Sequence, residues 1–174
     1  MTYDAESRVV TNVQSGVTTK CFYDAKGIRV RKCQPDCASP TSSTVYIFGG
    51  TQVIAGYNTL TSPPALLREY IYAGGQMLAL EEGGATKYFL RDHLSVRVLT
   101  DSSGTKIGEQ AHYPFGEDWY ATGTTTNQMF TSYPHESESG NDYAIRRNHS
   151  CRLGRFTTAD PVRGRISNPQ RLNR

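Results

Sequence analysis

The chain reads as a series of short runs of alternating residues separated by glycine-rich turns. The run "SVRVLT" (residues 95–100) alternates Val96, Val98 and Thr100 against Arg97 and Leu99, which is typical of a half-buried strand. Tyr, Thr and Val favour strands, and the chain contains 11 Tyr among its 174 residues. No convincing stretch repeats apolar residues at the i, i+3, i+4, i+7 spacing of a helix. The pattern predicts an all-β protein.

A repeat at an offset of 20 residues organises the first part of the chain. "TYDAESRVV" (2–10) aligns with "FYDAKGIRV" (22–30), so that an aromatic residue precedes Asp4 and Asp24 in the two copies. Each copy predicts a strand, a turn and a strand, with the Asp side chain capping the turn. Gly27 supplies the positive φ at the second turn, whereas Ser7 stands at that position in the first, which predicts a less favourable turn.

A second repeat, at an offset of 24 residues, predicts two further hairpins. "YIFGGTQVIA" (46–55) matches "YIYAGGQMLA" (70–79), with reversals at residues 49–50 and 74–75. The connecting stretch "NTLTSPPALL" (58–67) predicts a loop because the Pro63-Pro64 pair excludes a central strand. "CQPDCASPTSST" (33–44) predicts another loop.

A third hairpin completes a meander. After "SVRVLT", the turn "DSSG" (101–104) repeats the Asp-x-x-Gly pattern of residues 24–27, and "TKIGEQ" (105–110) returns. A chain of such hairpins predicts an antiparallel sheet in which tyrosines stack across neighbouring strands.

The net charge of +3 is unevenly distributed. Residues 1–142 carry 11 Lys and Arg against 15 Asp and Glu, or −4, whereas residues 143–174 carry 8 Arg against one acid, or +7. We interpret the basic end as a segment that packs into a larger body, and we expect no nucleic-acid partner. The sequence shows neither a signal peptide in "MTYDAESRVV" nor a run approaching the ~18 apolar residues of a membrane span.

Cysteines and histidines predict no metal site and no cofactor. The C-x3-C pair of Cys33 and Cys37 has no matching second pair, and a disulfide between them requires an oxidising compartment. Cys21 and Cys151 complete the four. Single histidines are more often hydrogen-bonded structural residues than ligands, and the chain has four, which are His93, His112, His135 and His149.

These motifs resemble those of the rearrangement-hotspot (RHS), or YD-repeat, family. The Tyr-Asp hairpins resemble its namesake repeat, "DHLSVRVLTDSSGTKIGEQAHYPFGEDWY" (92–120) resembles the repeat before its core domain, and "FTSYPHESESGNDYAIRRNHSCRLGRFTTADP" (130–161) resembles that core. The resemblance divides the chain into hairpin repeats over 1–118 and a partial RHS repeat-associated core over 119–174. The positions that carry it are Tyr3, Asp4, Tyr23, Asp24, Gly27, Asp92, His93, Leu94, Gly104, Tyr113, Pro114, Phe115, Gly116, Gly140, Tyr143, Gly154, Arg155, Phe156 and Pro161.

The resemblance implies a fold and a role. Family members build a spiralling β-strip, closed at one end by an irregular core segment, that encloses a variable C-terminal polypeptide, frequently a toxin. It implies that the chain belongs to a longer RHS polypeptide, with that polypeptide or its toxin as partner, secreted or at the cell surface. An alternative from related repeats is a carbohydrate-binding or adhesion module that contacts cell-surface glycans. Whether the chain is a short gene, a decaying copy or a fragment stays open.

The resemblance also implies a self-cleavage site that is incomplete. Complete members use two acids and an Arg; the first acid matches Asp160 and the Arg matches Arg147, whereas the second acid belongs to an Asp-Pro-x-Gly motif absent from this sequence. One carboxylate cannot serve as both acid and base, so Asp160 is expected to form a salt bridge with Arg147 and the chain is expected not to be an enzyme. The core also departs from the family at Asn148-His149, where two tyrosines are usual, and at 133–136.

Three other groups of residues have a chemical and a structural interpretation. Glu136, Glu138 and Asp142 flank "SGN" and favour a solvated turn over a glycosidase pair or a calcium loop. Asp92 and His93 near Ser95 favour a strand end over a hydrolase triad, with His93 a structural hydrogen-bonder. Trp119 and Tyr120 favour packing between turns of the strip over stacking on a sugar.

Overall fold

The structure is a computed structural model that describes residues 1–128, 131 and 133–158. The first sheet has twelve strands in sequence order, each antiparallel to the next. We call this sheet the strip. Its strands are β1 (Thr2–Tyr3), β2 (Val9–Gln14), β3 (Val17–Tyr23), β4 (Arg29–Gln34), β5 (Ser42–Gly49), β6 (Gln52–Asn58), β7 (Ala65–Ala73), β8 (Gln76–Glu82), β9 (Ala85–Arg91), β10 (Val96–Thr100), β11 (Lys106–His112) and β12 (Asp118–Gly123).

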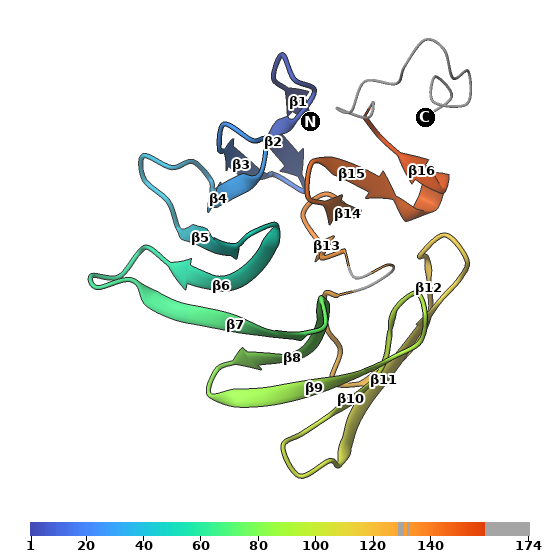
Figure 1. The fold of residues 1–174 in the computed structure, drawn as a ribbon. Helices are drawn as coiled ribbons and strands as arrows, with labels where there is room; N and C mark the ends of the chain where they lie inside the picture. The colour runs from blue at the N-terminus through green and yellow to red at the C-terminus, as the bar shows by residue number, and fades with distance from the viewer. Residues whose placement is uncertain (129–130, 132, 159–174) are drawn as a thin grey trace.

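The remaining elements form a small second sheet. We call the described residues from 124 to 158 the return segment. Its elements are β13 (His135–Glu136), β14 (Asn141–Ala144), β15 (Arg147–Ser150), the short 3-10 helix η1 (Cys151–Leu153) and β16 (Arg155–Phe156), with the four strands antiparallel in sequence order. The strip curls into an open C, and β13–β16 lie in its opening (Figure 1). The all-β prediction is confirmed, and the boundary predicted between residues 118 and 119 falls at β12 and stays a prediction.

The predicted Asp turns form as expected. In the first two, Asp4 Oδ1 accepts hydrogen bonds from the backbone N–H of Glu6 and Arg8, and Asp24 Oδ1 accepts from Lys26 and Ile28. Ser7 has a φ of 62° where Gly27 has 78°, so the serine takes the strained position predicted for it. The same turn recurs at 101–104 and, without an Asp, at 113–116.

Bulges at equivalent places bend the two central hairpins. The register shifts between Ile47 and Phe48 in β5, and between Ile71 and Tyr72 in β7, which is 24 residues later, as in the sequence repeat. A bulge increases the local twist of a strand pair, so the repeat carries curvature as well as pairing. The predicted loops are shorter than expected, because Leu66 and Leu67 already belong to β7 and β4 extends to Gln34.

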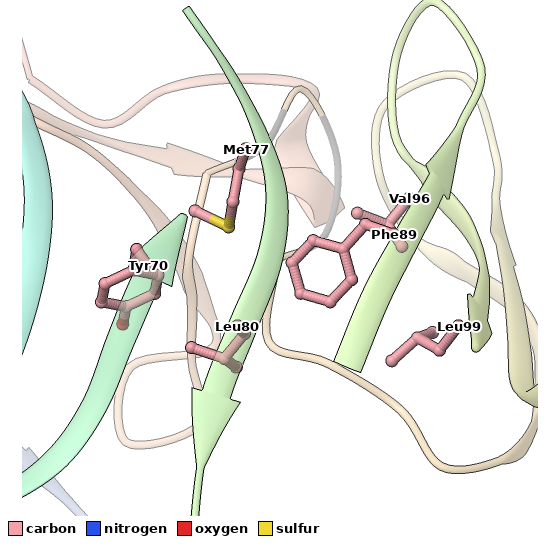
Figure 2. Close-up of a cluster of buried hydrophobic side chains, with 6 residues drawn as sticks. All are labelled: Tyr70, Met77, Leu80, Phe89, Val96 and Leu99. Carbon is pink, nitrogen blue, oxygen red and sulfur yellow. The ribbon is translucent and has the colours of Figure 1, made fainter. Parts of the chain in front are cut away.

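The main apolar cluster is formed by side chains of β7–β10 (Figure 2). Tyr70 pairs with Leu80 and Phe89 with Leu99, so each pair shares a face of the strip. Val96 and Leu99 are fully buried, and each buried side chain of this kind contributes about 1.5–3 kcal/mol. The six residues are Tyr70, Met77, Leu80, Phe89, Val96 and Leu99. By contrast, Ile47, Ile71 and Leu90 are exposed, so the core is one-sided.

Candidate functional site

The return segment begins where two glycines let the chain cross the strip. Gly108 of β11 pairs with Gly123 of β12, and a Cβ at Gly108 would collide with the carbonyl of Thr124. Thr124 donates its N–H to Ile107 O at 2.8 Å, and Thr126 donates its N–H to the buried Gln110 side chain. The glycine pair therefore allows the backbone to leave β12 and run back along β11.

A buried ion pair joins the return segment to the strip. Arg29 of β4 is 5% exposed, and its Nη1 lies 2.5 Å from Oε1 of Glu136 in β13. The hydroxyl of Tyr143 accepts a hydrogen bond from the Arg29 N–H at 2.9 Å, and its ring lies 4.0 Å from the guanidinium carbon. Burial opposes the charge on Arg29, but Glu136 and neighbouring groups raise its pKa well above the ordinary value, so it stays a cation.

A second ion pair lies beside the first. Lys32 Nζ contacts Oε1 of Glu138 and lies 3.8 Å from Oε1 of Glu136. The Glu138 carbonyl accepts a hydrogen bond from the Asn12 side chain of β2. Burial raises the pKa of Glu138, but the charge of Lys32 and its hydrogen bond outweigh burial and hold that pKa below the usual range. The return segment is thus anchored to β2 and β4.

Asp142 is enclosed by two histidines of the same small sheet. It is 1% exposed; its Oδ1 lies 2.8 Å from His135 Nδ1 and its Oδ2 lies 3.4 Å from His149 Nδ1. The hydrogen bond that His135 donates to Asp142 raises the pKa of His135, although burial opposes the shift. The expected solvated turn at Glu136, Glu138 and Asp142 is therefore wrong for these side chains. The exposed residues of the turn are Ser137 and Gly140, and the acids form ion pairs.

Two motifs that are far apart in sequence touch at the end of the strip. Gly154 ends η1 in the left-handed region, with a φ of 60°. The ring of Phe115, in the turn that follows β11, lies directly over the place where a Cβ of Gly154 would be. Tyr113, Pro114 and Gly116 form the rest of that turn, in which Gly116 has a φ of 95°. This contact joins the "YPFG" and "RLGRF" stretches.

Only part of the predicted self-cleavage site can be described. Arg147 lies with its guanidinium carbon 3.6 Å from the centroid of the Phe156 ring. Asp160 and Pro161 lie outside the described residues. The expected salt bridge between Arg147 and Asp160 therefore stays a prediction.

The Asp92–His93 stretch forms a turn without a hydrolase triad. Asp92 Oδ1 accepts hydrogen bonds from the backbone N–H of Leu94 and Ser95, both at 2.7 Å. Although burial raises it, these bonds and Arg97 lower the pKa of Asp92 to about 2. The structural role expected for His93 is not observed: its side chain is exposed and makes no hydrogen bond within the described part of the chain.

His112 and Trp119 lie in the last two strands of the strip, and the predicted packing of Trp119 and Tyr120 between turns of the strip stays a prediction. Burial lowers the pKa of His112, whose Nδ1 lies 3.3 Å from Asp118. Trp119 is 63% exposed, with its ring centroid 6.1 Å from that of Tyr113 and 5.5 Å from that of Tyr120. Within this chain Trp119 is therefore part of an exposed aromatic group.

The remaining motif residues have structural roles where they lie in described elements. Tyr23 donates its hydroxyl to Val9 O at 2.8 Å and stacks with Arg8, whereas Tyr3 is exposed. Cys33 and Cys37 form a disulfide with Cα atoms 5.5 Å apart, and Cys21 and Cys151 are free. Among the described residues no group of three or more potential ligands could hold a metal ion. No helix in that part of the chain is long and apolar enough to cross a membrane.

A cavity of about 620 Å³ lies between the strip and the return segment. Strands β4–β8 and Arg91 of β9 supply one wall, and described residues between positions 127 and 145 supply the other. Arg29 and Glu136 both line it, so the ion pair that anchors the return segment also forms part of the wall. No sequence pattern indicated this cavity, because its two walls come from distant parts of the chain.

Fold and site together define an antiparallel β-meander curled around its own return segment. Solved structures with the same fold include the complex TcdB2-TccC3 (TM-score 0.64, 14% identity) and TcdB2-TccC3 without its hypervariable C-terminal region (TM-score 0.66, 16% identity). The Photorhabdus luminescens Tc holotoxin pore gives a TM-score of 0.64 at 13% identity. Each alignment covers 92% of this chain and 9% of the other. No family profile matches the chain, and no curated protein matches it.

Proposed function

We propose that the chain is a structural segment of an RHS/YD-repeat shell that encloses and delivers a C-terminal polypeptide, with a toxin as the cargo. The observation that carries this proposal is the strip itself: twelve consecutive antiparallel strands curl around a return segment that is ion-paired to their concave side. The likeness to TcdB2-TccC3 supports the proposal at the level of the fold. The chain acts as part of a larger secreted or cell-surface assembly.

In this proposal the ion pairs and the Phe115–Gly154 contact hold the return segment against the wall, and the chain performs no catalysis. The carboxylates of Glu136 and Glu138 are each bound to a cation, and Asp142 is bound to two histidines. The pKa of Glu138 is held below its usual range by Lys32, which suits a fixed structural charge and not a general acid.

The decisive experiment is protease protection in the complete polypeptide encoded around this segment. We expect the polypeptide that follows the segment to resist trypsin in the folded protein and to be digested when the wall is weakened by Leu99→Ala. Reading frames that encode more Tyr-Asp hairpins beside this one would agree with that result. A downstream polypeptide that is digested equally in both proteins would contradict the proposal.

The exposed group of Tyr113, Trp119 and Tyr120 favours a second candidate, a glycan-binding module. Aromatic faces stack on sugar rings, and Trp119 is the most exposed large apolar residue among those described. A glycan array with wild type and Trp119→Ala separates the two functions. Reproducible sugar binding that is lost in the variant favours the second function, and its absence leaves the structural role.

A further inference from the structure

We infer that the cavity between the strip and the return segment binds a small organic anion that carries an aromatic ring. This inference goes beyond the proposed shell function and does not depend on it. The cavity's volume of about 620 Å³ falls within the roughly 300–1,000 Å³ of pockets that hold small organic ligands. The class of ligand follows from three features of the cavity: its charge, its aromatic rings and a glycine in one wall.

The cavity lining carries an excess of positive charge. Arg29, Lys32, Arg68 and Arg91 line it with one acid, Glu136. Glu138 and Glu82, which pair with Lys32 and Arg68, lie just outside the lining, so the net charge with these acids included is 4 − 3 = +1 with His135 neutral. Basic residues also dominate residues 159–174, with four Arg and one Asp, so that part of the chain has the wrong sign to be the ligand. The cavity therefore favours an anion from elsewhere.

Arg68 is the cation best suited to hold the ligand's charge. Arg29 is committed to Glu136 and Lys32 to Glu138 in buried contacts. Arg68 contacts Glu82 at 2.9 Å, but both side chains of this pair are about one-third exposed, at 32% and 35%. Such a partly exposed pair contributes about 0–1 kcal/mol, so a ligand anion can compete with Glu82 for the guanidinium.

Aromatic rings line the same wall as Arg68. Tyr46 and Phe48 come from β5, and Tyr70 and Tyr72 come from β7. Burial raises the pKa of Tyr72 to about 12, so its hydroxyl is neutral at physiological pH and adds no negative charge to the lining. Rings beside an arginine suit a planar ligand whose charged group is attached to a ring.

Gly56 leaves one position between lining residues of this wall without a side chain. It lies between Tyr46 and Arg68 in one row across β5, β6 and β7. A Cβ at Gly56 would lie 3.5 Å from Arg68 Cγ and 3.6 Å from Thr44 Cγ2, which is ordinary contact, and the backbone there does not require glycine. Because Thr44 and Arg68 both line the cavity, a larger side chain at residue 56 would extend between them into the open space.

Each wall of the cavity contains a buried polar group that lacks a hydrogen-bond partner among the described residues. Gln128 is 3% exposed, and its Oε1 has no hydrogen bond among the described residues; the Nε of Arg29 likewise has none. Buried polar atoms without partners are rare and costly. Both residues line the cavity, which is consistent with walls built to face a polar ligand.

Isothermal titration calorimetry of the full chain with phenyl phosphate tests the inference. Benzyl alcohol supplies the ring alone, and inorganic phosphate supplies the charge alone. We expect saturable one-to-one binding of phenyl phosphate, with each half-ligand at least about tenfold weaker. No binding at about 10 mM phenyl phosphate, or equal binding of inorganic phosphate alone, would overturn the inference.

Two variants place the binding in the cavity. Gly56→Leu adds a large side chain between Thr44 and Arg68 and is expected to weaken the binding of phenyl phosphate at least about tenfold. Arg68→Gln removes the cation and is expected to weaken phenyl phosphate while leaving benzyl alcohol unchanged. Arg31→Gln is the matched control, because Arg31 belongs to β4 of the same sheet and bonds Ser43 without lining the cavity. Folded variants that bind as well as wild type would show that the ligand sits elsewhere and overturn the assignment.

Discussion

The Phe115 ring covers Gly154 so closely that a Cβ at Gly154 would lie 3.1 Å from Phe115 Cγ and 3.2 Å from Cδ1. The contact joins the turn after β11 to the end of η1, which are separated by about forty residues. Gly154 is therefore required twice: once for its left-handed φ of 60°, and once for the absence of a side chain under the ring.

We predict that Gly154→Ala lowers the free energy of unfolding by more than its backbone strain alone. The left-handed conformation costs a non-glycine residue about 1–2 kcal/mol, and displacement of the Phe115 ring adds to it. Gly140→Ala is the matched control, since Gly140 has a φ of 65° but nothing within 4 Å of its Cβ position. Urea denaturation measures both variants, and equal losses would contradict a role for the Phe115 contact.

The ion pair of Arg29 and Glu136 gives a second prediction. Glu136→Gln leaves a cation that is 5% exposed without its charge partner, and breaking a buried pair in this way costs about 3–5 kcal/mol. The double variant Arg29→Met/Glu136→Leu removes both charges and should recover much of the loss. Chemical denaturation followed by circular dichroism gives the values. A single variant within about 0.5 kcal/mol of wild type would exclude an anchoring role.

Local features could be predicted from the sequence, whereas the site could not. The turns at Asp4, Asp24 and Asp101 formed as predicted because an Asx turn needs only residues within four positions. Glu136 and Glu138 were misassigned because their partners are distant in sequence: Glu138 bonds Lys32, 106 residues earlier. β9 (Ala85–Arg91) was not predicted from the sequence.

Protonation of His135 should make stability depend on pH. The pKa of His135 is raised in the folded state by its hydrogen bond to Asp142. Its contribution is therefore complete below the unfolded pKa of about 6.5 and is lost as pH rises through the folded value. The difference in unfolding free energy between wild type and His135→Gln should shrink as pH rises from about 5.5 to 8.5. The pKa of His112 is lowered in the folded state of both proteins, so its effect cancels in the difference between their unfolding free energies. A difference that stays constant across that range would refute this role for His135.

We predict that the purified chain does not cut itself. The sequence contains Asp160 and Arg147 at the positions implied by the family resemblance, but no Asp-Pro-x-Gly motif that would supply the second acid. Incubation at several pH values, followed by intact-mass spectrometry, should show a single species. A fragment that forms in wild type but not in Asp160→Asn would prove the prediction wrong.

The edge of β12 should make the isolated chain associate. β12 pairs with β11 on one side, is the last strand of the strip, and is exposed along its whole length. Residues 119–134 contain no charged side chain, so nothing in this stretch discourages pairing with another strand. We expect the apparent mass in size-exclusion chromatography with light scattering to rise with protein concentration. Ala121→Lys places a charge on the exposed strand and should shift the protein towards the monomer. Ser102→Lys adds the same charge in an exposed turn and should have no effect. If both lysine variants reduce association equally, net charge and not the β12 edge controls association. A wild-type protein that stays monomeric at every concentration would show that the β12 edge does not pair with another chain.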